Sequence, residues 1–289
     1  MSCAIVDFLD CGVDYITSTS ASRSSTRELL AVGEKLMKRE YRNGGIEKSW
    51  GMSGFTGWCC GHVQMGRRGQ EGIVRLGSIV AQDKWRMVHA AGSNVSRLDL
   101  QVTTRTETPA RKSIARHFRQ ASRWSKASPG RSTVSIFSTS DGPSTVYCGK
   151  RSSDQFGRIY DKGAESGLDH WTNAVRYEVE MKAERAMRAA DFLASQSKPL
   201  VQVQSLVSTF FSGRGCDLQW TWADTNISCP RSRSDLERRL RWIEESVRPS
   251  VLLLMHRGKS KEVLAALGLV QTARGKLTTL QLAKRANAA

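Results

Sequence analysis

Three short segments alternate apolar residues with charged or polar ones, as a β-strand with one buried face requires. They are the segments 96–103, 156–162 and 175–182. Successive side chains on a strand point to opposite faces. In the middle segment this alternation places Arg158, Tyr160 and Lys162 on one face. The pattern therefore predicts three strands that each carry reactive groups on a single side.

The other two segments supply carboxylates. Alternation places Asp99 in the first segment, and Glu178 and Glu180 in the third, on the charged sides. Carboxylate oxygens are the ligands that Mg²⁺ and Mn²⁺ prefer. A free phenol has a pKa of about 10 and is a weak nucleophile at neutral pH, but nearby cations favour its phenolate. If the strands are neighbours, these acids, the cations and Tyr160 together suit attack on a phosphodiester. Each strand alone equally fits the solvated side of a half-exposed sheet.

The sequence around these strands indicates helices. A helix is predicted over residues 24–40, where Ser25 and Glu28 form a capping box. Residues 51–104 are expected to form short strands punctuated by glycine. A second helix is predicted to begin at Thr108.

The later sequence returns to strands and then to helices. Strand-like runs lie at 133–138, 146–160 and 174–182. Ser234 and Glu237 form another capping box in a basic C-terminal part. The order of elements predicts an α+β fold, with a large antiparallel sheet, helices packed on one of its faces and a basic helical C-terminal region. We expect a catalytic core over residues 1–190 and the mainly helical basic region over 191–289.

The composition points to an acidic partner. The 289 residues include 44 Lys and Arg against 27 Asp and Glu, a net charge of +17, and such a surface attracts nucleic acid or an anionic membrane. The longest apolar run, residues 251–255, is far shorter than the ~20 residues that span a bilayer. Seven cysteines without a Cys-x-x-Cys spacing indicate free thiols in a reducing cytoplasm. We therefore expect a cytoplasmic protein that binds nucleic acid.

One predicted helix carries a row of cations. They recur at spacings of four, three, four and three residues, which places them along one side of a helix. This basic stripe consists of Lys112, Arg116, Arg119, Arg123 and Lys126. No acidic residue interrupts it, so phosphate contact is favoured over a plain solvated face.

At the three charged strands the sequence also resembles a known family. The motifs are Arg-Leu-Asp-Leu at 97–100, Arg-Ile-Tyr-Asp-Lys-Gly at 158–163 and Val-Arg-Tyr-Glu-Val-Glu at 175–180. They are similar in order and spacing to the marker strands of the replication initiation factors of filamentous phages and rolling-circle plasmids. The preceding segment 147–152 is similar to the family's lead-in to the tyrosine strand.

The resemblance implies a site-specific DNA endonuclease and strand transferase. Tyr160 would cut the origin strand and hold its 5′ phosphate as a phosphotyrosine, and Lys162 would neutralise charge on the phosphate. Asp99 and Glu178 would bind Mg²⁺ or Mn²⁺, with Glu180 as a weaker candidate. The implied partners are single-stranded or hairpin origin DNA, a host helicase and polymerase, and a second copy in a homodimer. A His-hydrophobic-His metal pair, found in the wider superfamily, is missing, since all five histidines are isolated.

Several alternatives stay open on the sequence alone. A relaxase or transposase would use similar chemistry, and a non-catalytic DNA-binding regulator would have a similar basic surface. Among the other tyrosines, Tyr177 falls on the apolar side of its strand and is expected in the core. Tyr147 is the stronger competitor for the role of nucleophile.

Overall fold

The chain forms two compact units, residues 1–229 and 230–289. The computed structural model describes residues 7–127, 133–138, 144–218, 220, 243, 247–260 and 263. The division into units lies beyond the boundary at residue 190 expected from the sequence, because two helices that follow the sheet pack on it and belong to the first unit. The described helix of the second unit is α8, Arg248–His256. The predicted capping box of Ser234 and Glu237 lies outside the described residues.

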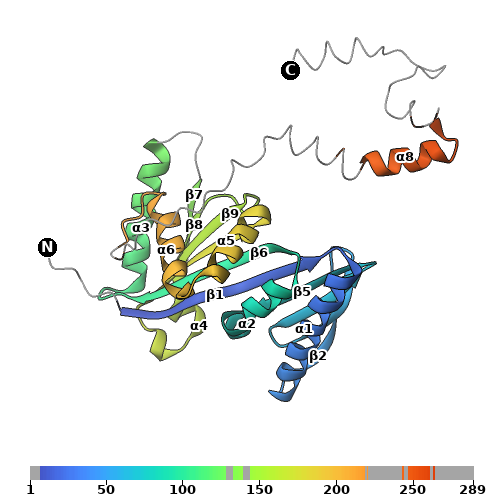
Figure 1. Cartoon of the computed structure of the whole chain (residues 1–289). Coiled ribbons are helices and arrows are strands. Elements are labelled where there is room, and N and C mark those ends of the chain that lie inside the picture. The colour runs from blue at the N-terminus through green and yellow to red at the C-terminus, as the bar shows by residue number, and fades with distance from the viewer. Residues whose placement is uncertain are drawn as a thin grey trace, which may run out of the picture. The chain divides into compact units, whose positions relative to one another are not determined.

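The first unit is built on one ten-stranded antiparallel sheet. Its strands are β1 (Asp7–Ser20), β2 (Glu47–Met52), β3 (Phe55–Cys60), β4 (Val63–Arg68), β5 (Glu71–Gly77), β6 (Asn94–Arg105), β7 (Val134–Ser138), β8 (Ser144–Cys148), β9 (Gln155–Asp161) and β10 (Ala174–Lys182). They lie in the order β2-β3-β4-β5-β1-β6-β10-β9-β8-β7. Figure 1 shows the long strand β1 running from the end of the unit that holds α3 and α6 to the end that holds α1 and β2.

Helices pack along the sheet, which confirms the predicted α+β class. They are α1 (Arg23–Arg42), α2 (Ser78–Ala91), α3 (Ala110–Ala127), α4 (Lys162–Ser166), the 3-10 turn η1 (Asp169–Trp171), α5 (Ala183–Ser195) and α6 (Pro199–Ser212). Helix α1 lies on β4 and β5, α2 beside β1 and β5, and α3 on β7, β8 and β9. Helices α5 and α6 lie on the central strand β6. None of the described helices is long and apolar enough to cross a membrane.

One face of the sheet, the apolar face, forms the core with these helices. In the register, Leu98, Leu100 and Val102 of β6 lie opposite Met181, Val179 and Tyr177 of β10, and all six are buried. Burying a side chain of this size contributes about 1.5–3 kcal/mol. Helix α3 reaches this layer through His117, whose Nε2 lies 3.0 Å from the hydroxyl of Tyr177. Helix α6 reaches it through Phe211, whose ring meets Tyr177 edge-on.

Two local expectations were wrong. Residues 78–91, expected among short strands, form α2, in which the buried Ala81, Trp85 and Val88 recur at helical spacing. The glycines on either side of this segment concealed the helical period. Helix α1 begins at Arg23, within one residue of the prediction, but its cap is Ser22 and not Ser25: the Ser22 hydroxyl accepts a hydrogen bond from the Ser25 backbone N–H.

Candidate active site

The register brings the three charged strands together. Strand β10 lies between β6 and β9, as the sequence required for a common site. Glu180 lies opposite Asp99 on β6, Glu178 lies opposite Arg158 on β9, and Tyr160 lies opposite Arg176. Paired residues of an antiparallel ladder project from the same face. These side chains therefore share the face that lies opposite the apolar face, and we call it the charged face.

The hydroxyl of Tyr160 is held by a carboxylate. It donates a hydrogen bond of 2.5 Å to Oε1 of Glu178, whose other oxygen accepts from Arg158. Burial, the negative charge of Glu178 and this hydrogen bond raise the pKa of Tyr160 above its ordinary value. The expectation that flanking cations would favour the phenolate is therefore not met. Arg158 forms an ion pair with Glu178, and Nζ of Lys162 lies 2.5 Å from Oε2 of Glu165, so neither cation is paired with the Tyr160 oxygen.

A single arginine joins the two carboxylates at the centre of the charged face. One nitrogen of Arg97, Nη2, lies 2.6 Å from Oδ2 of Asp99 and 2.8 Å from Oε2 of Glu180. Lys182 pairs with the other oxygen of Glu180 at 2.8 Å. Burial raises the pKa of Asp99 to about 6 against the opposing effect of Arg97, and the charges of Glu180 and Glu178 add to the rise. Two buried acids thus converge on one cationic atom.

The residues at this point fit a hard divalent cation by their chemistry. Two carboxylate oxygens already converge on a cation, and Mg²⁺ is commonly held by one or two carboxylates together with water. Glu178 is directed instead to Tyr160 and Arg158. Within the described residues, no cluster of three or more Asp, Glu, His or Cys side chains is arranged to hold a metal.

Strand β1 contributes acids that sequence reasoning missed. Asp10 accepts hydrogen bonds from Gln101 at 2.7 Å and from Arg176 at 3.1 Å, and Asp14 lies 3.9 Å from Arg176. Burial, followed by the charge of Glu178, raises the pKa of Asp14. β1 is irregular around these residues, with register shifts at 8–10 and 13–15. The shifts break the period of two, so no alternation marked these acids in the sequence.

The competing tyrosines separate clearly. Tyr177 is 3% exposed and lies in the core, as predicted. Tyr147 lies opposite Arg158 in the register of β8 and β9, so it projects from the charged face, where its ring stacks on Phe156. It remains the alternative to Tyr160.

The comparisons with known proteins agree with this architecture. The model of a family described as replication initiation factor matches residues 94–267, more than half of the chain, and the match includes β6, β9 and β10. This chain belongs to the replication initiation factor family. Among solved structures, it is similar to the rolling circle replication initiator protein from Geobacillus stearothermophilus, with a TM-score of 0.51 and 16% identity over 77% of this chain and 89% of that one. At this identity the likeness concerns the fold. No curated protein sequence matches the chain.

In this family member the basic stripe lies away from Tyr160. Helix α3 packs on the apolar face through Ile114 and His117, whereas Tyr160 projects from the charged face. The four stripe residues Lys112, Arg119, Arg123 and Lys126 are exposed, and Arg116 is half-buried, with its Nε buried. The structure therefore does not bring the stripe and the tyrosine together on one face.

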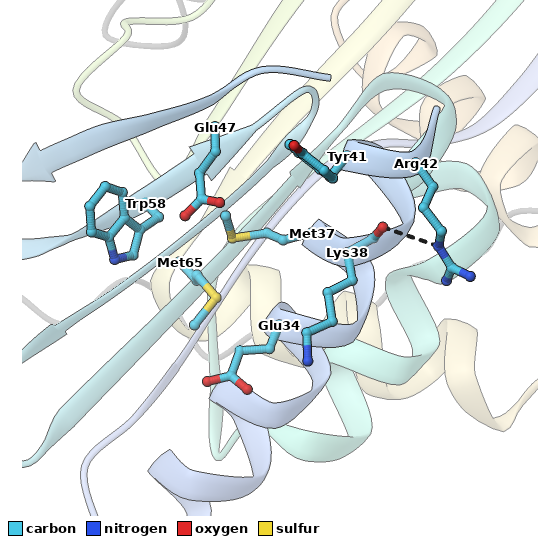
Figure 2. A pocket seen from close by; sticks show the side chains of 8 residues that line it. All are labelled: Glu34, Met37, Lys38, Tyr41, Arg42, Glu47, Trp58 and Met65. Atoms are coloured by element: carbon cyan, nitrogen blue, oxygen red, sulfur yellow. Dashed lines mark hydrogen bonds between the residues drawn. The ribbon is translucent and has the colours of Figure 1, made fainter. Parts of the chain in front are cut away.

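A groove beside α1 is also separate from the tyrosine. It has a volume of about 660 Å³ and lies between α1 and the strands β3 and β4. Figure 2 shows Met37 of α1 and Met65 of β4 within it, with Tyr41 and Trp58 at its sides. Met65 lies against Gly33 of α1, so this groove is on the helix-covered side of the sheet.

Proposed function

We propose that this initiation factor starts rolling-circle replication by nicking, and later rejoining, single-stranded origin DNA through Tyr160. The hydrogen bond of 2.5 Å from the Tyr160 hydroxyl to Glu178 carries the proposal. It pairs a nucleophile with a base on a face that is rich in cations, which is the arrangement that covalent catalysis needs. A DNA-binding regulator without catalytic activity has no use for it.

The bond suggests how each atom would be used. The Tyr160 oxygen attacks the scissile phosphorus while its proton passes to Glu178, and a new bond forms between tyrosine and the 5′ phosphate. The bond to the 3′ oxygen breaks, and this oxygen takes up a proton from solvent, which leaves a 3′ hydroxyl that a polymerase can extend. Attack by a 3′ hydroxyl on the phosphotyrosine reverses these changes and rejoins the strand without ATP.

The raised pKa of Tyr160 supports a role for Glu178 as general base. A phenol that stays protonated at neutral pH needs an acceptor within hydrogen-bonding distance when it attacks. Arg176, which lies opposite Tyr160 in the register, opposes the rise and would favour the developing phenolate. Lys162, two residues along the chain, would have to leave Glu165 to neutralise charge on the phosphate.

Asp99 and Glu180 are the residues proposed to hold Mg²⁺ or Mn²⁺, since both converge on one cationic nitrogen. A divalent ion bound there would supply polarisation of the scissile phosphate. Glu178, the ligand implied beside Asp99 by the family resemblance, is better placed to serve Tyr160.

The test is a covalent-complex assay with the full chain, a single-stranded candidate origin and Mn²⁺. Tyr160→Phe keeps the ring and removes the attacking oxygen, so the covalent protein–DNA band should disappear from a denaturing gel while DNA binding survives. Tyr147→Phe, from the same face, is the matched control and should keep the band. Loss of the band only in Tyr147→Phe would transfer the role to that residue. If neither change affects cleavage, the proposal fails.

A further inference from the structure

The charged face continues beyond the candidate active site into the strands β2 to β5, which we call the hairpin extension. A single row of paired residues crosses from β10 to β2 without a break. The row is Lys182, Arg97, Thr17, Arg75, Gln64, Cys59 and Lys48. Because paired residues share a face, Arg75 and Lys48 project on the same side of the sheet as Tyr160. The row includes four cations and no acid.

Along this surface, arginines lie on aromatic rings. The guanidinium of Arg97 lies 4.7 Å from the ring centre of Tyr15, that of Arg75 lies 5.2 Å from Trp50, and that of Arg68 lies 4.7 Å from Phe55. Each pair sets a planar cation beside a planar ring. Surfaces that bind single strands combine cations for the backbone with rings on which bases stack.

Arg75 is a cation without a partner of opposite charge. Within the part of the chain that the structure describes, no carboxylate lies within ion-pair distance of it, and its Nε is buried without a hydrogen-bond partner. One of its terminal nitrogens, Nη1, donates a hydrogen bond to the sulfur of Met52 at 3.2 Å. Burial and the charge of Arg97 lower the pKa of Arg75. The guanidinium groups of Arg75 and Arg97 are close enough to repel each other, and Arg75 has no carboxylate partner among the described residues. A phosphate would relieve this repulsion.

The ring of Trp50 packs closely on Gly66 of β4. Trp50 is opposite Gly57 in the register, which is in turn opposite Gly66, and a Cβ on Gly66 would lie 3.0 Å from the Trp50 ring. Glycine in a strand often marks close approach of a ring or ligand. Trp50 remains half-buried, so part of its surface is accessible for stacking.

We propose that the hairpin extension binds single-stranded DNA on the same face of the sheet as the scissile phosphate, with Arg75 on the backbone and Trp50 stacked on a base. The inference rests on the proposed function for the position of the scissile phosphate. Charge complementarity and continuity with the row through Arg97 favour this occupant, since the row itself carries four cations and no acid. Glu71, an acid of the same surface, is paired with Arg68.

The chain provides controls on the neighbouring strands, with side chains that project from the opposite face of the sheet. Arg67 of β4 is exposed and lies opposite Gly72, on the side of Met65 and the helices. Trp58 of β3 is 52% exposed and lies opposite Met65, in the groove of Figure 2. The test therefore compares Arg75→Gln with Arg67→Gln and Trp50→Ala with Trp58→Ala.

The measurement is fluorescence anisotropy of a labelled oligothymidylate of about 20 nucleotides, long enough for one extended site, in excess chelator. Trp50→Ala should raise the Kd by about five- to a hundredfold. Arg75→Gln should raise it and lower the slope of log K against log salt by about 0.7, the value for one phosphate contact on a single strand. The two control variants should bind as the wild type does.

Equal binding by wild type, Arg75→Gln and Trp50→Ala, all folded by circular dichroism, would overturn the proposal. So would equal losses in the control variants. If Trp50→Ala does not fold, the comparison of Arg75→Gln with Arg67→Gln decides. Because oligothymidylate has no origin sequence and no cleavage occurs, the result stands whether or not Tyr160 proves to be the nucleophile.

Discussion

Two basic surfaces of this protein differ in how their cations are held. On the basic stripe of α3, four of the five cations are exposed, and within the described residues none lies over an aromatic ring. On the hairpin extension, Arg68 and Arg75 are fixed against Phe55 and Trp50. Exposed cations attract a polyanion over a broad surface, whereas cations held against rings select where a phosphate and a base lie. Counting charges in the sequence cannot make this distinction.

Both basic surfaces are proposed to bind DNA, whereas cleavage is proposed to occur at Tyr160 and Glu178. The largest effect on the cleavage rate is therefore expected from a change at Glu178. Glu178→Gln keeps the shape of the side chain but removes the proposed acceptor of the Tyr160 proton. Covalent product should form at least about a hundredfold more slowly, measured as the rate of adduct formation on single-stranded origin DNA. Binding of DNA at either basic surface should change little.

Glu165→Gln is the control for this prediction, because Glu165 is an exposed acid that pairs with Lys162. Its adduct rate should stay within a few-fold of the wild type. A Glu178→Gln variant that is folded and as fast as the wild type would remove Glu178 from the reaction.

A moderate effect is expected at the basic stripe. Arg119→Glu should weaken binding of any DNA sequence and reduce the salt slope by about 0.7 to 0.9 for the lost phosphate contact, while the cleavage rate of bound DNA is unchanged. Arg119 is preferred to Arg116 because it is exposed, so reversing its charge buries nothing. Arg111→Glu makes the same charge change on α3 but off the stripe, and binding titrations at several salt concentrations compare the two. If Arg119→Glu and Arg111→Glu give the same slope of log K against log salt, the stripe does not contact phosphates and is an ordinary solvated surface.

The smallest effect concerns the attachment of α3 to the sheet. Burial lowers the pKa of His117 from 6.5 to about 4. Below pH 6.5 the unfolded chain takes up a proton at His117 that the folded protein does not accept until about pH 4. The stability from this group is therefore present above pH 6.5 and is lost as the pH falls toward 4. Between pH 7 and pH 5 the loss is about 2 kcal/mol.

Urea unfolding of the wild type and of His117→Gln at both pH values isolates this contribution, because all other titrating groups are common to the two proteins. The wild type should lose about 2 kcal/mol more than the variant. Equal losses would show that the pKa of His117 is the same in the folded and unfolded protein, and that this residue does not make stability depend on pH.

Much of the fold could be predicted from the sequence, because strands with one buried face keep a strict period of two. That period identified β6, β9 and β10 and placed Asp99, Glu178 and Tyr160 on one face. The sequence could not predict which side chains of the charged face bond to one another, since this depends on the register of the strands and on the length and conformation of each side chain. Glu178 therefore appeared as a metal ligand, although it bonds Tyr160, and burial outweighs the flanking cations in setting the pKa of Tyr160.

Gly157, which has no side chain, determines how closely β9, the strand that carries Tyr160, packs on α6. A Cβ on Gly157 would lie 2.3 Å from the Phe210 ring and 3.0 Å from the Phe211 ring. The backbone of β9 therefore rests directly on α6, with no intervening layer that could absorb a displacement. Any movement of α6 toward the sheet would be passed to the tyrosine three residues further along. The two phenyl rings thus limit how closely β9 and α6 can approach, and substitutions of Phe210 or Phe211 would alter the position of Tyr160 on the opposite face.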